Sequence, residues 1–61
     1  MSISTLIKQD RLNYLLNHTG IEKIIDEYHD EDFSEYIGTI GGDAVCYRVI
    51  DVDGEYCITQ R

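Results

Sequence analysis

The stretch Ile21-Glu22-Lys23-Ile24-Ile25-Asp26-Glu27-Tyr28-His29-Asp30-Glu31-Asp32-Phe33-Ser34-Glu35 is the part of the chain around which the rest is organised. Its apolar residues recur at i, i+3, i+4 and i+7, the spacing that places side chains on the core-facing side of a helix. These residues are Ile21, Ile24, Ile25 and Tyr28. Just before them, Thr19 and Glu22 have the spacing of a capping box. We therefore predict a helix from about residue 20 to residue 29.

The segment before this stretch predicts another helix, over residues 4–18. Ser4 is a favourable N-cap residue, and the apolar positions 7, 12, 14, 15 and 16 follow a mixed i, i+3, i+4 pattern. Because that pattern is irregular, a second start at which Asp10 caps a helix from Arg11 stays open. The break at His18-Thr19-Gly20 is short, so the two helices should pack as a hairpin or cross at a steep angle.

Residues 30–38 allow two interpretations. Asp32 and Glu35 are spaced to cap a short helical turn that Gly38 would end. The alternative is a strand over residues 34–40 that enters a sheet. Cross-strand pairing in the next segment favours the strand.

The C-terminal part predicts β-hairpins. Residues 44–52 are rich in β-branched and aromatic side chains, and Asp53-Gly54 indicates a tight turn to a partner strand over residues 55–60. A turn at Gly41-Gly42 would add the strand from residue 34. The two turns set these residues opposite each other: Val52 and Glu55, Ile50 and Cys57, Val49 and Ile58, Arg48 and Thr59, Tyr36 and Tyr47, and Glu35 and Arg48.

This register divides the predicted sheet into two faces. The face that should meet the helices carries Tyr36, Ile40, Val45, Tyr47, Val49, Tyr56 and Ile58. The other carries Ile37, Ala44, Cys46, Arg48, Ile50, Cys57 and Thr59, a partly apolar set that a partner could cover. The predicted fold is therefore α+β, with two N-terminal helices packed on a C-terminal three-stranded antiparallel sheet (ααβββ), in a single small domain over residues 1–61.

Charge limits the classes of partner. The formal net charge is −7, with 12 acidic residues against 5 basic ones. Such a chain repels nucleic acid and anionic membranes, and it favours fast, salt-sensitive association with basic proteins. The N-terminal segment lacks the features of a signal peptide, and two cysteines are too few for a disulfide framework. We expect a cytoplasmic protein with no direct nucleic-acid or membrane binding.

Metal and cofactor sites have weak support. His18, His29, Cys46 and Cys57 are zinc-type ligands, but they lack the close pairs of structural zinc sites. The predicted register separates the two cysteines by several rows, which favours free thiols. Two acidic segments that start at Asp30 and Asp51 miss the glycine and glutamate of a calcium loop. We therefore predict no metal and no cofactor.

Catalysis is also disfavoured. Acid pairs are plentiful, but a chain of 61 residues rarely encloses a pocket that shifts a pKa. The segment Gly38-Thr39-Ile40-Gly41-Gly42 lacks the lysine and the following helix of a phosphate loop. No serine lies in a nucleophile-elbow sequence. The prediction is that the protein is not an enzyme.

The acids of the opening stretch remain as the candidate site. In a helix they would form like-charge i,i+4 pairs, and three of them would gather at its C-terminal end, where the helix dipole disfavours them. A row of carboxylates about 6 Å apart can imitate a phosphate backbone. Tyr28 and Tyr36 are candidate interface anchors if they are exposed. The predicted partner-binding residues are Glu22, Asp26, Glu27, Asp30, Glu31, Asp32 and Glu35.

Three functions fit these features. The first is a small inhibitor that covers the basic surface of a nucleic-acid-handling protein by DNA or RNA mimicry. In size and acidity such a protein resembles, in general style only, phage anti-defence proteins such as anti-CRISPR and anti-restriction proteins, which act in the cytoplasm of the host cell. The second is an antitoxin or immunity protein against a basic nuclease. The third is a homo-oligomeric accessory or structural module, possible as a homodimer, that assembles through a sheet edge or the second sheet face.

Overall fold

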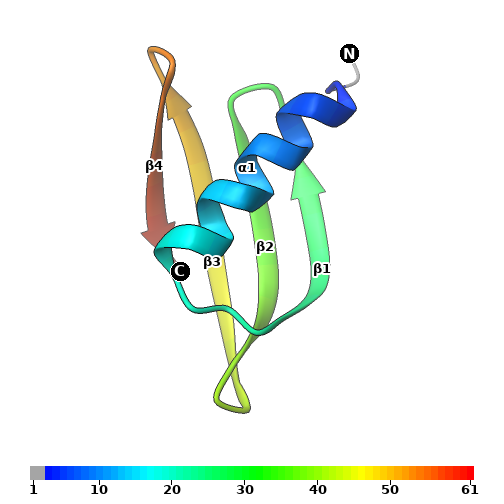
Figure 1. Ribbon diagram of the computed structural model, residues 1–61, viewed down its shortest axis with the longest axis vertical. Coiled ribbons are helices and arrows are strands. Elements are labelled where there is room, and N and C mark those ends of the chain that lie inside the picture. Colours follow the sequence, from blue (N-terminus) through cyan, green and yellow to red (C-terminus); the bar gives the residue numbers. More distant parts are fainter. Residues whose placement is uncertain (1–2) are drawn as a thin grey trace.

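The computed structural model describes residues 3–61, which form one helix and a four-stranded antiparallel sheet (Figure 1). Each strand pairs with its neighbours in the chain, in the order β1-β2-β3-β4. The α+β class is confirmed, but one helix and four strands replace the predicted two helices and three strands. The elements are α1 (Thr5–His18), β1 (Lys23–His29), β2 (Phe33–Ile40), β3 (Asp43–Val52) and β4 (Glu55–Gln60).

The first predicted helix is confirmed as α1. The Ser4 hydroxyl accepts a hydrogen bond from the Ile7 N–H at 3.2 Å, as expected of an N-cap. The helix continues through Asp10, so the alternative start at Arg11 is wrong. At the other end, the backbone N–H and the hydroxyl of Thr19 both donate to the Leu15 carbonyl, at 3.0 and 2.8 Å. Within residues 3–61, no helix is long and apolar enough to cross a membrane.

The second predicted helix is wrong, because its residues form β1. Gly20, with a φ of +91°, turns the chain away from α1, and Thr19 caps the end of α1 instead of starting a new helix. Isoleucine and tyrosine favour strands, since their side chains pack well on a pleated surface. In a strand the acids four residues apart are separated by about 13 Å, so the like-charge pairs of the helical interpretation disappear.

A β-bulge in β1 explains the helix-like spacing. Ile24 pairs with Gly38 and Asp26 pairs with Ile37, so Ile25 is an extra residue without a partner on β2. The extra residue breaks the alternation expected of a regular strand. Two apolar residues side by side then resemble the i+3 and i+4 positions of an amphipathic helix.

Residues 33–40 are strand β2, which confirms the strand interpretation and rejects the helical turn. Gly38 does not end a helix but lies in the middle of the sheet. A Cβ atom there would lie 2.0 Å from the Lys23 carbonyl oxygen and 2.7 Å from Cδ1 of Ile21. Only glycine lets the start of β1 lie this close to β2.

Both predicted hairpins and their registers are confirmed. The turn at Asp53-Gly54 sets Val52 opposite Glu55, and the turn at Gly41-Gly42 sets Ile40 opposite Asp43. Every predicted pair is found, including Glu35 with Arg48. At the first of these turns the Gly54 N–H donates to the Asp51 carboxylate at 3.0 Å, so the acids there form a turn.

α1 lies across one face of the sheet, and residues 3–61 supply no helix to the other face (Figure 1). The helix-covered face holds the core: Leu15 of α1 packs with Ile21, Tyr36 and Val49, all buried. The predicted core residues of β3 and β4 pack around them, partly buried. The open face carries Lys23, Asp26, Tyr28, Phe33, Glu35, Ile37, Thr39, Ala44, Cys46, Arg48, Ile50, Val52, Glu55, Cys57, Thr59 and Arg61.

Candidate functional site

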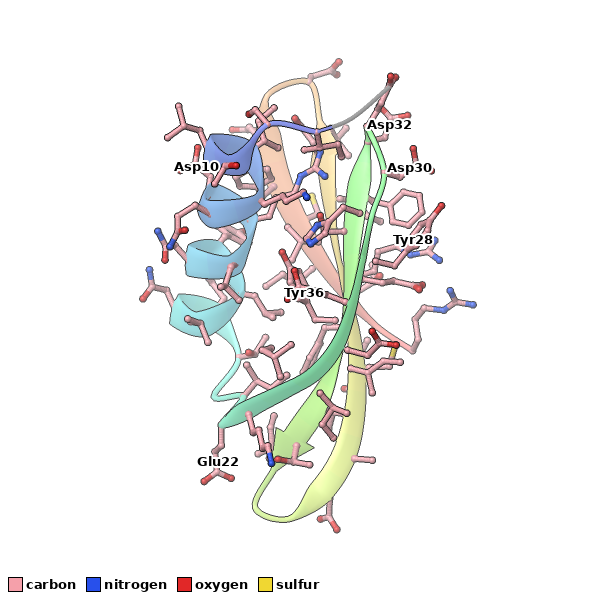
Figure 2. All side chains as sticks on the ribbon, turned by 90° about the vertical axis from the view of Figure 1, so that its right-hand side faces the viewer. Asp10, Glu22, Tyr28, Asp30, Asp32 and Tyr36 are labelled. Carbon is pink, nitrogen blue, oxygen red and sulfur yellow. The ribbon has the colours of Figure 1, made fainter. Side chains whose placement is uncertain are left out.

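The seven predicted partner-binding acids do not form one row. Their segment is a strand and a hairpin loop, so the 6 Å helical spacing does not exist. Figure 2 shows Glu22 at one end of the molecule, and Asp30 and Asp32 at the other. The alternation of β1 and β2 also divides the set: Asp26 and Glu35 lie on the open face, and Glu27 lies on the helix-covered face.

Several of these acids have local structural roles. Glu22 accepts a hydrogen bond from the Gly41 N–H and so ties the start of β1 to the β2–β3 turn. Asp26 accepts from the N–H of Glu27 at 2.9 Å, and Asp30 accepts from the N–H of Glu31 at 2.7 Å. All of these acidic residues remain exposed. Their hydrogen bonds therefore leave oxygen lone pairs free for a partner.

Glu27 belongs to a chain of side chains that resembles an acid–histidine–serine arrangement. His29 contacts the Glu27 carboxylate through Nε2 at 2.5 Å and the Ser34 hydroxyl through Nδ1 at 2.7 Å. Ser34 also accepts from Arg11 at 3.0 Å, and its exposed fraction is 0%. A serine this deeply buried is out of reach of a substrate, so the arrangement acts as a structural hydrogen-bond network.

Arg11 lies at the centre of this hydrogen-bond network. The sequence pattern alone did not identify it as a structural or functional residue. One guanidinium nitrogen donates to the carbonyls of Asp30 and Phe33, at 2.7 and 3.1 Å, and the other donates to the Glu31 carbonyl at 2.6 Å. The side chain is 1% exposed. Arg11 therefore fixes the β1–β2 loop to α1. Its position four residues before the buried Leu15, on the apolar side of α1, was the available signal.

The buried charge of Arg11 gives the backbone of the loop a structural role. A cation removed from water is stabilised by carbonyl oxygens. The carbonyls of Asp30 and Glu31 accept from the guanidinium, whereas the carboxylates of the same residues stay exposed. Arg11 therefore orders the loop backbone and leaves its acidic side chains accessible.

The fold brings a second set of acids to the same end of the molecule. The Asp51 N–H donates to the Asp32 carbonyl at 2.8 Å, which joins the end of β3 to the β1–β2 loop. The β3–β4 turn follows directly, so both hairpins end there (Figure 1). We call this surface the acidic end. It consists of Asp30, Glu31, Asp32, Asp51, Asp53 and Glu55, all of them exposed.

The cations of the chain do little to neutralise the acidic end. Arg11 is buried beneath it, and Arg48 and Arg61 both bind Glu35 on the open face. Lys23, the first residue of β1, lies at the opposite end of that strand, and Lys8 lies in the N-terminal half of α1; in residues 3–61 neither lysine forms an ion pair with these acids. Of the 12 acidic side chains, all except Glu35 are exposed. The exposed charge of the acidic end is therefore strongly negative.

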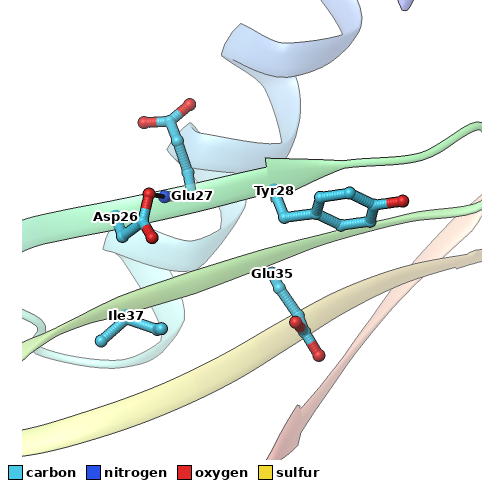
Figure 3. A pocket seen from close by; sticks show the side chains of 5 residues that line it. All are labelled: Asp26, Glu27, Tyr28, Glu35 and Ile37. Carbon is cyan, nitrogen blue, oxygen red and sulfur yellow. Dashed lines mark hydrogen bonds between the residues drawn. The ribbon is translucent and has the colours of Figure 1, made fainter.

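The open face has a different character (Figure 3). A pocket there is lined by Asp26, Glu27, Tyr28, Glu35 and Ile37, and Glu27 points away from the others toward α1. Glu35 accepts from Arg48 and from Arg61, each at 2.6 Å. The hydrogen bond from Arg48, and then that from Arg61, hold the Glu35 pKa below its usual value.

Aromatic side chains border this ion-pair network. The Arg48 guanidinium lies 4.5 Å from the centre of the Phe33 ring, a cation–π contact, and the Phe33 ring centroid is 6.0 Å from that of Tyr28. Tyr28 is 57% exposed, whereas Tyr36 is buried against α1 (Figure 2). Of the two predicted anchor tyrosines, only Tyr28 is therefore available to a partner.

The cysteines also lie on the open face. Cys57 pairs with Ile50, and the Arg61 N–H donates to the Cys46 carbonyl, so the two thiols lie two rows apart on neighbouring strands, in agreement with the predicted register. Both are free cysteines. In residues 3–61, no group of three or more histidine, cysteine or acidic side chains is placed to hold a metal ion.

The chain matches no known protein family, and no curated protein or solved structure is significantly similar to it. Function is therefore inferred from the two surfaces described above. They are the acidic end and the open face.

Proposed function

We propose that this protein is a small acidic binding protein that inhibits a nucleic-acid-handling protein by covering its basic surface, as a DNA or RNA mimic would. The observation that carries the proposal is the acidic end. There two separate hairpins present six exposed carboxylates on one surface, and the one arginine among them is buried. Partner-binding residues in this proposal are Asp30, Glu31 and Asp32, joined by Asp51, Asp53 and Glu55.

The physical basis is the similarity between carboxylate and phosphate as hydrogen-bond acceptors. Arginine and lysine side chains that bind phosphate form charge-assisted hydrogen bonds with carboxylates as well. Arg11 adds rigidity, since its bonds to three loop carbonyls hold the acids in place before a partner arrives. A surface that is already ordered loses less conformational entropy on binding.

The same surface suits an antitoxin or immunity protein that neutralises a basic nuclease. The physics of binding is shared, and the two proposals differ only in the partner. Electrostatic attraction would make either association fast and sensitive to salt. Identification of the retained protein distinguishes them.

A pull-down from host lysate at low and high salt tests the proposal. We expect a basic, nucleic-acid-binding protein to be retained at low salt and released at high salt. Addition of the purified acidic protein should then displace nucleic acid from that partner in a gel-shift assay. Retention of no such protein at low salt, or a ternary complex with nucleic acid still bound, would contradict the proposal.

Matched double variants locate the binding surface. Asp30→Asn with Asp32→Asn neutralises two charges at the acidic end, and Glu22→Gln with Asp43→Asn neutralises two charges at the opposite end. Both variants have the same net charge. We expect the first to weaken partner binding roughly tenfold or more and the second to change it much less. Equal losses would mean that total charge, and not this surface, determines binding.

A further inference from the structure

The open face of the sheet has an ordered arrangement of charge. Residues that pair across β1, β2, β3 and β4 form rows perpendicular to the strands. One row places an acid on β1 and a base directly after the end of β4. The next row places an acid on β2 and a base on β3. The rows are Asp26–Ile37–Cys46–Arg61, then Tyr28–Glu35–Arg48–Thr59, then Phe33–Ile50–Cys57.

This arrangement is complementary to itself. When a row is reversed and laid over a copy of itself, Asp26 meets Arg61 and Glu35 meets Arg48. The apolar members meet as well, Ile37 with Cys46 and Phe33 with Ile50. A twofold axis that lies between the two faces and runs parallel to the strands produces this match. It reverses the order of the strands and keeps each row opposite the same row of the other copy.

We propose that the open face is the interface of a homodimer with this symmetry, with β1 of each copy over β4 of the other and β2 over β3. The two sheets would then pack face to face with aligned strands, as in a β-sandwich. Each Glu35–Arg48 pair would gain an oppositely charged neighbour from the second copy. Two Asp26–Arg61 pairs would close the two borders of the interface, with the Arg61 side chain turning from Glu35 of its own chain to Asp26 of the other.

A twofold axis perpendicular to the strands does not give this match. Centred on the middle row, it lays Glu35 over Glu35 and Arg48 over Arg48. Shifted to lie between rows, it sets both side chains against apolar residues of the second copy, where the charges lose water without gaining a partner. The charge arrangement therefore selects the axis parallel to the strands.

The sheet edges are less suited to assembly than the face. On β1 the bulge at Ile25 interrupts the edge, and the Asp26 carboxylate already binds the N–H of Glu27. On β4 the Tyr14 hydroxyl donates to the Tyr56 carbonyl at 3.0 Å, so α1 covers part of that edge. The open face has no such protection, because Tyr28, Ile37 and Val52 are each 42–57% exposed.

The size of the face predicts a weak dimer. The longest dimensions of the molecule are 33 and 19 Å, and these bound the area of the face. Two such faces bury roughly 1,200 Å² in total, the lower limit for a stable interface. We therefore expect association in the micromolar range. Small domains commonly gain stability in this way, since one short chain encloses a limited core.

The dependence on salt distinguishes this dimer from the proposed complex with a basic partner. Two copies of charge −7 repel each other, and the parallel axis places both acidic ends at the same end of the dimer. Salt screens that repulsion and also the two Asp26–Arg61 pairs at the borders. Because the net charge of −7 on each copy outweighs two pairs, salt should tighten the dimer, whereas it weakens a complex with a basic protein. The dimer uses the open face, so the failure of either proposal leaves the other intact.

Analytical ultracentrifugation of the full chain tests the dimer directly, from micromolar to millimolar concentration at low and high salt. We expect a monomer–dimer equilibrium that salt shifts toward dimer. A monomer at every concentration and salt would overturn the proposal and leave the face to another partner. A dimer that dissociates at high salt would also overturn it.

Charge reversal then tests the geometry. In the proposed dimer, Asp26→Arg alone places two arginines together at each border, and Arg61→Asp alone places two aspartates together. We expect each variant to dimerise about tenfold more weakly than the wild type. An equimolar mixture should form a heterodimer at about the wild-type affinity, because both borders again join opposite charges. The rescue requires folded protein, so unfolding cannot imitate it.

The matched controls lie on α1, where Asp10 and Lys8 are exposed. Asp10→Arg and Lys8→Asp change the net charge by the same amounts, and neither residue lies on the open face. We expect these variants to keep the geometry of the dimer and to show no specific heterodimer when mixed. Equal rescue by the control mixture, or no rescue by the Asp26→Arg and Arg61→Asp mixture, would overturn the proposed symmetry.

Discussion

The two faces of the sheet come from the same four strands and differ in what covers them. On the helix-covered face, Tyr36 and Val49 are 0% exposed; on the open face, Ile37 and Val52 are 42% and 50% exposed. Ile37 is a chain neighbour of Tyr36, so the alternation of β2 places an apolar residue on each face. The comparison shows that an apolar strand residue is buried only where α1 covers it.

The two faces also differ in how they shift the pKa of an ionisable side chain, as the neighbouring residues Glu35 and Tyr36 show. Glu35 lies on the open face, where hydrogen bonds from Arg48 and Arg61 lower the pKa of its carboxyl group. Tyr36 lies under α1, where burial raises the pKa of its hydroxyl group. One face therefore favours an ionised side chain, and the other disfavours it. The following four experiments test this difference between the two faces.

The largest expected effect is that of Arg11→Met. Loss of the guanidinium leaves the carbonyls of Asp30 and Glu31 without their donor, whereas the Phe33 carbonyl keeps the Asp30 N–H. We expect the free energy of unfolding to fall by about 3 kcal/mol, measured by urea denaturation. Arg11→Lys keeps the charge but not the forked geometry, so it should lose less. If Arg11→Met were as stable as the wild type, the β1–β2 loop would not depend on Arg11 for its conformation.

A matched pair of valines on β3 measures the contribution of burial. Val49→Ala removes two methyl groups from the core, and we expect it to lower the free energy of unfolding by about 2 kcal/mol. Val52→Ala removes the same atoms from the open face and should cost less than about 0.5 kcal/mol in the monomer. Thermal unfolding at low protein concentration gives both values. Similar losses would mean that the open face is covered even in dilute solution.

Acid titration tests the ion-pair network of the open face. Because the folded-state pKa of Glu35 is lowered, its contribution to stability is present above its ordinary pKa and is lost as pH falls through the lowered value. Glu35→Gln should flatten this part of the pH profile of stability, by less than the two preceding effects. The measurement is the urea midpoint between neutral and acid pH. An unchanged acid slope would exclude Glu35 as a source of the pH dependence.

A small effect of either sign is expected for Tyr36→Phe. Within residues 3–61, the buried Tyr36 hydroxyl makes no hydrogen bond of normal geometry, although the Ser34 side chain lies near enough to act on its pKa. Its removal should therefore leave stability within about 1 kcal/mol of the wild type or raise it. The raised pKa favours folding below the ordinary tyrosine pKa, and that contribution is lost as pH rises through the raised value. The variant should lose this alkaline dependence. A large destabilisation would mean that the hydroxyl is bonded in solution.

The parts of the fold that depend on a few adjacent residues could be predicted from the sequence. Asp53-Gly54 and Gly41-Gly42 define tight turns, and a tight turn determines which residues face each other along both strands. The register and the two faces followed from these turns. The Ser4 cap and the first helix were also accessible, because capping involves residues within one helical turn.

The candidate site was less accessible, since it depends on long-range contacts. Ile21 to His29 has an apolar pattern that fits a helix, and only pairing with β2 shows that a bulge at Ile25 produces it. Like-charge i,i+4 pairs argue against a helix, but the apolar spacing alone favours one, so the sequence predicts a helix with unfavourable charge pairs. Arg11 was missed for the same reason, because its partners lie about 20 residues away in the chain.

The amino-acid sequence by itself determined the excess of acids, the two hairpin turns and the alternation that divides each strand between two faces. The tertiary structure decided that Lys23–His29 is an edge strand, that Arg11 binds the β1–β2 loop, and that Asp51 and Asp53 join Asp30–Asp32 at one end. The physical reason is the range of the interactions. Turns and caps are satisfied by neighbouring residues, whereas strand pairing and a buried cation are stabilised only when distant segments meet.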